Sequence, residues 1–176
     1  MSNRVIVIVG AGPGVSGSVA RAFAADGYAV GLLGIDEDQL GQLSEELSGR
    51  GTAVEWAVAD VTDAEAAAGA VAGFGEKLGR IDVLHFNPSA FRQKTPLELT
   101  VPELLDDVAL GVGALLTAVQ AARPFMSAGG RVTATGSMAA DKPWNEAASL
   151  GVQKAGLRVS SSLLQVAAGV ESGGGK

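Results

Sequence analysis

The sequence predicts an α/β protein built on a doubly wound parallel sheet of about five strands. Short β-branched runs alternate with longer alanine-rich segments along the 176 residues, as expected for strands joined by crossover helices. The first apolar run, residues 5–9, passes through a glycine-rich turn directly into a helical pattern. A strand that enters a helix in this way is typical of a βαβ unit.

The individual elements are expected in strict alternation. Strands are short runs rich in Val, Ile and Leu, whereas helices carry apolar residues three or four positions apart. Three helix starts are marked by an oxygen acceptor three residues before Glu or Gln, namely Asp36, Thr62 and Thr100. The expected strands cover residues 4–9, 29–33, 53–58, 81–86 and 131–135, and the expected helices cover residues 15–25, 39–47, 65–78, 103–126 and 147–168.

Length and composition indicate a single domain over residues 1–170 and a flexible tail over residues 171–176. A chain of 176 residues that is 47% hydrophobic can bury one sizeable core, and it is short for two. The tail, Glu-Ser-Gly-Gly-Gly-Lys, has the glycine-rich composition of a flexible segment.

The charge balance and the rare residue types exclude several classes of function. A net charge of −6 offers no cationic surface for nucleic acid or for anionic lipid. The absence of cysteine excludes disulfides, thiolate zinc sites and a cysteine nucleophile, and a single histidine makes a metal site improbable. With no apolar stretch of about 18 residues apparent, we expect a soluble cytoplasmic protein that binds a small molecule.

The glycine-rich turn after the first strand is the strongest functional motif. Glycines at 10, 12, 14 and 17, with Pro13 and Val15 between them, allow positive φ angles and close backbone approach. The first amides of the following helix and its dipole would then face the pyrophosphate of a dinucleotide. Two registers remain open: Gly12, Gly14 and Gly17 fit G-x-G-x-x-G literally, whereas Gly10 and Gly14 fit a wider spacing with Ser16 third.

Further residues follow the later strands in a recognisable order. Asp60 and Val61 follow the third strand, Asn87 and Pro88 follow the fourth, Ser137 follows the fifth, and Lys154 lies on the last helix. This order resembles the short-chain dehydrogenase/reductase family over essentially the whole chain. The resemblance implies a Rossmann-type fold and selects the Gly10 and Gly14 register.

The resemblance also assigns expected roles. It implies a cofactor site made by the turn, Gly10, Gly12, Pro13, Gly14 and Val15, with Asp60 and Val61 beside the adenine. It places Asn87 and Pro88 at the strand end beside the cofactor and lets Lys154 bond the nicotinamide ribose. Ser137 and Lys154 are the expected catalytic residues. All of these lie where open α/β sheets bind ligands, at the carboxyl ends of the strands.

The choice between NAD and NADP rests on Asp36, about twenty residues beyond the glycines. An acid there can accept a hydrogen bond from the ribose 2′-hydroxyl, so NAD is favoured over NADP. The turn and Ile35 offer no cation for a 2′-phosphate. The alternative interpretation is that Asp36 only caps its helix.

The expected catalytic set is incomplete. Relatives carry a tyrosine four residues before the lysine as general acid and base, and here that position is Leu150. The asparagine that relatives carry on the fourth helix falls near Gly111. His85 is a candidate replacement proton donor, with a buried structural histidine as the alternative. The resemblance further implies that the C-terminal strands of the family are missing.

Two functions follow from this pattern. The first is an NAD(P)-dependent oxidoreductase that acts on a carbonyl or alcohol of a small molecule, with Trp144 and Phe91 as candidates to line an apolar pocket. The second is a non-catalytic dinucleotide-binding subunit or sensor. A flavoprotein is less compatible because Val15 replaces an expected glycine. A homo-oligomer through the helices at 103–126 and 147–168 is expected from the apolar face of the first and the alanine-rich second, with core packing as the alternative explanation of both.

Overall fold

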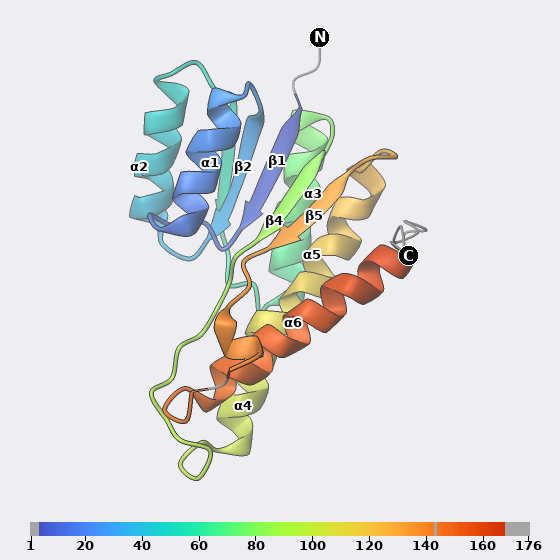
Figure 1. Ribbon diagram of the computed structural model, residues 1–176. Helices are drawn as coiled ribbons and strands as arrows, with labels where there is room; N and C mark the ends of the chain where they lie inside the picture. Colours follow the sequence, from blue (N-terminus) through green and yellow to red (C-terminus); the bar gives the residue numbers. More distant parts are fainter. Residues whose placement is uncertain (1–3, 143, 168–176) are drawn as a thin grey trace. The chain divides into compact units, whose positions relative to one another are not determined.

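A computed structural model describes residues 4–142 and 144–167, and the predicted tail at 171–176 lies outside the described residues (Figure 1). The chain forms two compact units. The sheet unit comprises the residues up to Pro88 together with Ala114–Thr135, and the helical unit comprises Ser89–Gly113 and the residues from Gly136 onward.

The sheet unit contains one five-stranded parallel sheet with the strand order β3-β2-β1-β4-β5. This confirms the predicted fold class. The central strand β1 consists of Val and Ile alone and is fully buried, as expected for a strand covered on both faces. The strands are β1 (Val5–Val9), β2 (Ala29–Gly34), β3 (Val54–Val58), β4 (Val83–Phe86) and β5 (Arg131–Ala134).

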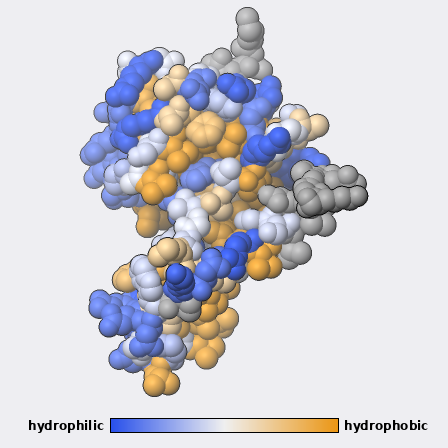
Figure 2. Space-filling view, in the orientation of Figure 1, coloured by the Kyte–Doolittle hydropathy of each residue, from blue (hydrophilic) through white to orange (hydrophobic). Residues whose placement is uncertain are grey.

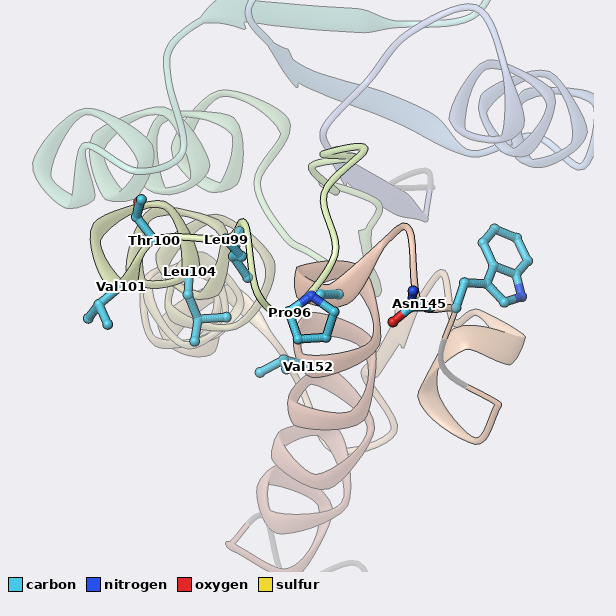
Figure 3. A pocket seen from close by; sticks show the side chains of 9 residues that line it. Pro96, Leu99, Thr100, Val101, Leu104, Asn145 and Val152 are labelled. Atoms are coloured by element: carbon cyan, nitrogen blue, oxygen red, sulfur yellow. The ribbon is translucent and has the colours of Figure 1, made fainter.

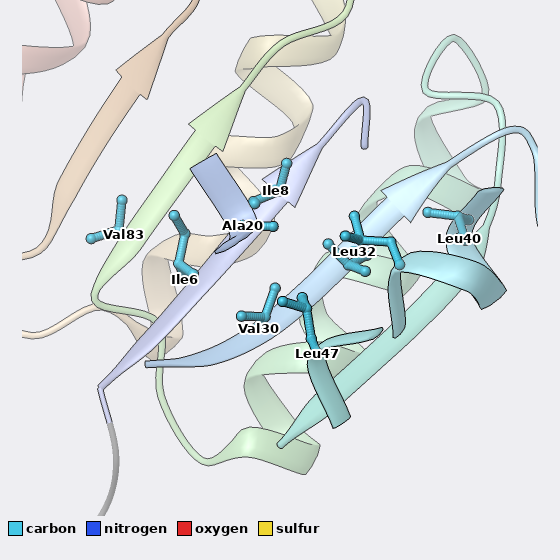
Figure 4. Close-up of a cluster of buried hydrophobic side chains, with 9 residues drawn as sticks. Ile6, Ile8, Ala20, Val30, Leu32, Leu40, Leu47 and Val83 are labelled. Atoms are coloured by element: carbon cyan, nitrogen blue, oxygen red, sulfur yellow. The ribbon is translucent and has the colours of Figure 1, made fainter. Parts of the chain in front are cut away.

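Helices cover both faces of the sheet. Helices α1 (Val15–Ala25) and α2 (Glu37–Ser48) pack on one face, and α3 (Ala64–Leu78) and α5 (Ala114–Ala122) pack together on the other (Figure 1). One cluster of buried hydrophobic side chains joins the sheet to α1 and α2 (Figure 4). It comprises Ile6, Ile8, Ala20, Val30, Leu32, Leu40, Leu43, Leu47 and Val83. Because all five strands are parallel, their carboxyl ends lie at the same edge of the sheet.

The helical unit is built on α4 (Val101–Val108) and α6 (Ala148–Ala167), which pack against each other. A π-helix, η1 (Ala109–Gly113), continues α4, and a short 3-10 helix, η3 (Met138–Ala140), packs on α6. The sequence predicted one uninterrupted helix at 103–126. That prediction is wrong, because α4, η1, α5 and the 3-10 helix η2 (Arg123–Phe125) follow one another there.

Two of the three predicted helix caps are confirmed. The Asp36 carboxylate accepts a hydrogen bond from the Gln39 amide, and Thr100 and Glu103 form a reciprocal capping box. The prediction that Thr62 caps α3 is wrong, because the Asp63 carboxylate accepts from the first amides of that helix. The Asp63 carboxylate, one residue nearer the helix, therefore makes the capping hydrogen bonds that were expected of the Thr62 hydroxyl.

The helical residues Val101–Phe125 are long and apolar enough to cross a membrane by length and composition, with 28% of the relevant window buried. The expectation that no such apolar stretch exists is therefore wrong on this criterion. The apolarity comes mainly from alanine, leucine and valine after Asp107. Helices that pack on a sheet meet the same criterion, so this feature alone indicates no membrane role.

Candidate functional site

The first glycine of the turn is required by its geometry. Gly10 has φ of +77°, and a Cβ at this position would lie 2.8 Å from the Pro88 ring. The amides of Gly10 and Ala11 both donate to the Leu33 carbonyl at the end of β2, at 2.9 and 2.8 Å. The turn is therefore fixed to the ends of two neighbouring strands before it reaches α1.

The other glycines of the turn differ in what surrounds them. A Cβ at Gly17 would lie 2.7 Å from the Gly12 carbonyl oxygen, so this glycine lets the backbone approach α1 closely. The Ser16 hydroxyl accepts from the Gly12 amide at 3.0 Å and closes the turn. Within the described residues nothing lies within 4 Å of a Cβ built at Gly14, which begins α1.

The amino end of α1 carries no side-chain cap in the structure as described. Its first-turn backbone amides have no partner within the helix, since every α-helix leaves its first N–H groups unbonded in this way. Together with the open space at Gly14, these donors and the positive end of the helix dipole form a cradle suited to an anion. Pro13 and Val15 flank Gly14 and are part of this cradle.

The two predicted acidic contacts lie at the ends of β2 and β3. Asp36 is exposed two residues beyond β2, and its Oδ1 atom accepts from the Gln39 amide at 3.0 Å. Asp60 is exposed two residues beyond β3 and accepts from both the amide and the hydroxyl of Thr62, which lowers its pKa. Val61 beside it is buried. Asp60 therefore remains ionised well below neutral pH.

Asn87 connects the end of β4 to the glycine turn. Its side-chain amide nitrogen donates to the Gly10 carbonyl at 3.2 Å, while its oxygen accepts from the Thr135 hydroxyl at 2.7 Å. Pro88, the next residue, occupies the space where a side chain at Gly10 would lie. Sequence reasoning placed Asn87 and Pro88 at the strand end beside the cofactor but predicted neither their contacts with the turn nor Thr135, because a threonine at a strand end has no distinctive spacing.

The predicted catalytic residues lie in the helical unit. The Ser137 hydroxyl oxygen accepts from the Ala139 amide at 3.1 Å and begins η3. Leu150 packs with Ala139 and Ala147 in a small apolar cluster, which links α6 to η3. Lys154 lies one helical turn beyond Leu150 and is buried, and burial lowers its pKa from the usual value.

Gln153 is a residue that sequence reasoning missed. Its amide is fully buried and makes two hydrogen bonds to the backbone of Ala90, accepting from the amide and donating to the carbonyl, both at 3.2 Å. The same side chain fills the space beside Gly111 in the π-helix, where a Cβ would lie 2.8 Å from Gln153 Oε1. Gln153 therefore holds the segment after β4 and the π-helix against α6.

An apolar pocket of about 580 Å³ lies between α4 and α6 (Figure 3). The side chains of Leu104 and Val152 point toward one another across it, and of the two aromatic candidates Trp144 lines it whereas Phe91 does not. Ala148 and Val152 line the pocket. Leu150 and Lys154 each follow one of them by two positions, which places them about 200° further around α6 at about 100° per residue. The pocket therefore lies on the opposite side of α6 from Lys154.

Two curated relatives are similar to this chain. It is 32% identical over 141 residues to an A-factor type gamma-butyrolactone 1'-reductase (1S-forming) of Streptomyces virginiae, covering 78% of this chain and 55% of that protein. It is 31% identical over 147 residues to the oxidoreductase UcpA of Escherichia coli K12, covering 80% of this chain and 56% of that protein. The chain thus spans about half the length of the curated relatives it matches.

The structure is also similar to solved structures. A short-chain dehydrogenase/reductase from Serratia marcescens superposes with a TM-score of 0.90 at 26% identity, covering 94% of this chain and 69% of that one. The sequence profile described as short chain dehydrogenase matches residues 4–169. The parallel sheet and the glycine turn agree with this match. The chain therefore belongs to the short-chain dehydrogenase family.

Proposed function

We propose that this chain is an NAD-dependent oxidoreductase that acts on a carbonyl or alcohol of a small molecule. The observation that carries the proposal is the uncapped amino end of α1 beside the open Gly14, where a pyrophosphate would be bound by backbone amides. The two curated relatives, a reductase and an oxidoreductase, support the reaction class.

The side chains at the strand ends fit a dinucleotide with an unmodified ribose. The exposed Asp36 carboxylate would accept hydrogen bonds from the adenosine ribose and would repel a 2′-phosphate. Asp60 and the buried Val61 would flank the adenine, and Asn87 and Pro88 would hold the turn from the other side. This set favours NAD over NADP.

In the helical unit, Ser137 and Lys154 are the proposed catalytic residues. The Ser137 oxygen accepts from the Ala139 amide, and its hydroxyl proton would be donated to a carbonyl oxygen of the substrate. The Lys154 ammonium would donate to the nicotinamide ribose. When bound, the nicotinamide supplies or takes up the hydride. Leu150 has no proton to transfer, so we propose that general acid catalysis is weak.

The first experiment tests binding by calorimetric titration of NAD and NADP. We expect NAD to bind more tightly than NADP. Gly14→Ala should retain the melting temperature, because a Cβ there meets open space, but should weaken NAD binding about tenfold or more. Asp36→Ser keeps a residue that can cap the helix, and it should weaken the binding of NAD but not that of NADP. If the parent chain binds neither dinucleotide, the proposal is wrong.

The second experiment tests the missing acid by comparing Leu150→Tyr with Leu150→Phe. The two variants are matched in size and differ by one hydroxyl, one helical turn from Lys154. General acid–base catalysis is typically worth about 10²–10⁴-fold in rate, so NADH-dependent carbonyl reduction should rise by that factor in the tyrosine variant only. Equal rates in the two variants would contradict a catalytic role for this position. Saturable NAD binding without turnover in any variant would identify a non-catalytic binding subunit.

We also propose that the protein is a homo-oligomer through α4 and α6. Large apolar side chains are exposed on these helices, with Val101 69%, Leu105 60% and Val152 48% exposed. Figure 2 shows apolar surface gathered on the helical unit around α4. The pocket between α4 and α6 continues the same apolar face. A second copy of the chain is the proposed occupant.

A further inference from the structure

A continuous chain of hydrogen bonds runs through the sheet unit from β5 to the glycine turn. His85 on β4 contacts the Thr133 hydroxyl through Nδ1 at 2.9 Å and the Thr135 hydroxyl through Nε2 at 3.4 Å. Thr135 then donates to Asn87 Oδ1 at 2.7 Å, and Asn87 Nδ2 donates to the Gly10 carbonyl at 3.2 Å. The only histidine of the sequence is thus linked to the predicted cofactor turn.

The chemistry of the groups assigns a direction to every bond in this chain. Gly10 presents a carbonyl, so the Asn87 amide must turn its nitrogen toward Gly10 and its oxygen toward Thr135. The Thr135 hydroxyl donates its single proton to that oxygen. Toward His85 the same hydroxyl can therefore only accept a hydrogen bond. His85 must carry its proton on Nε2, which leaves Nδ1 to accept from Thr133.

The environment of His85 agrees with a neutral ring. The residue is 8% exposed, and burial lowers its pKa from the usual value, so the ring is uncharged at neutral pH. Its register neighbours are Ile8 on β1 and Thr133 on β5. The neutral ring supplies one donor and one acceptor, as this chain of bonds requires.

We propose that His85, as the neutral Nε2–H tautomer, is a positioning residue that fixes the Asn87 amide and through it the Gly10 peptide of the dinucleotide-binding turn. Gly10 is in the left-handed region, its peptide begins the turn that leads into α1, and a Cβ there would lie 2.8 Å from Pro88. The expected effect on NAD binding rests on the proposed function, whereas the expected tautomer of His85 does not depend on it.

The first test is the ¹⁵N spectrum of the imidazole, which is unambiguous because the chain has one histidine. In the free protein near neutral pH we expect a protonated Nε2 and an unprotonated Nδ1. Thr135→Val removes the acceptor for Nε2 and should abolish this preference. A ring with its proton on Nδ1, or one that averages between tautomers in the parent protein, would overturn the proposal.

The second test measures NAD affinity in matched variants. Thr135→Val interrupts the chain between His85 and Asn87 and should weaken NAD binding about tenfold, the equivalent of one hydrogen bond of about 1.4 kcal/mol. Thr133→Val, two residues earlier on β5, leaves the link to the turn intact and should bind NAD like the parent protein. His85→Gln keeps a donor and an acceptor and should bind better than His85→Leu.

The outcomes separate this inference from the proposed function. If the parent protein binds NAD and all four variants bind it equally well, His85 does not position the turn. If the parent protein fails to bind NAD, the proposed function is wrong, and the tautomer and the Asn87 side-chain amide signals of the free protein still decide whether the chain of bonds exists.

Discussion

Glu103 stabilises the start of α4 through both carboxylate oxygens. One oxygen accepts from the Lys94 ammonium at 2.6 Å, and the other accepts from the amide and the hydroxyl of Thr100, each at 3.0 Å. Lys94 first, and then Thr100, lower the pKa of Glu103 to about 2. The folded protein therefore stabilises the ionised form of Glu103 more than the unfolded chain does.

This shift predicts how stability depends on pH. Because the folded pKa is below the ordinary value of 4.5, the stabilisation by Glu103 is present above about pH 4.5 and is lost as the pH falls toward about 2. We expect the parent protein to lose its stability advantage over Glu103→Gln as the pH falls from about 4.5 to about 2. Urea unfolding followed by tryptophan fluorescence measures this difference. An advantage that does not change with pH would contradict the assignment, and Lys94→Met should reduce the pH dependence.

Single residues could be predicted where the signal is local. The capping pairs at Asp36 and Thr100 follow from sequence spacing because each acceptor binds an amide three residues ahead. Thr62 has the same spacing, and the prediction was wrong because Asp63 competes for the same amides. Thr135 could not be predicted as a partner of Asn87, since that contact joins residues 48 positions apart.

At the scale of elements, alternation predicted the five strands and most helices, because buried parallel strands and crossover helices differ in composition and period. The break in the helix after Val108 was not predicted. Apolar periodicity continues across Ala109–Gly113, whereas the π-helix packs closely on α6 there, with Gly111 against Gln153 and Val112 against Gly156. Tertiary contact decides the local geometry at this point.

This packing predicts opposite effects of alanine at two glycines of the same π-helix. Gly111→Ala places a Cβ 2.8 Å from Gln153 Oε1 and should cost about 1–3 kcal/mol of stability. Gly113→Ala meets nothing within 4 Å in the described structure and should be neutral or stabilising by up to about 1 kcal/mol. Denaturant unfolding measures both changes.

A double-mutant cycle tests the partner directly. Gln153→Ala removes the side chain that crowds Gly111, so Gly111→Ala should cost less in that background than in the parent protein. We expect a coupling of about 0.5–3 kcal/mol between the two positions. Additive effects would show that Gln153 and Gly111 do not share this space.

For the molecule as a whole, the sequence predicted the family, whereas the surfaces that meet other molecules depend on which side chains are exposed. The expected oligomer is a case of this kind. Apolar spacing on the helices at 103–126 and 147–168 does not tell an interface from a core. Exposure of Val101, Leu105 and Val152 in the helical unit supports an interface on α4 and α6.

The oligomer prediction is tested by two matched valine substitutions. Val152 on α6 and Val58 on β3 are equally exposed, at 48%, and lie in different units. Val152→Lys places a charge in the proposed interface and should raise the dimer dissociation constant at least about tenfold, since burying an unpaired charge costs more than 1.4 kcal/mol. Val58→Lys should leave association unchanged. Sedimentation velocity over a range of concentrations measures both, and a parent chain that stays monomeric throughout, or equal association of the two variants, would place the interface elsewhere.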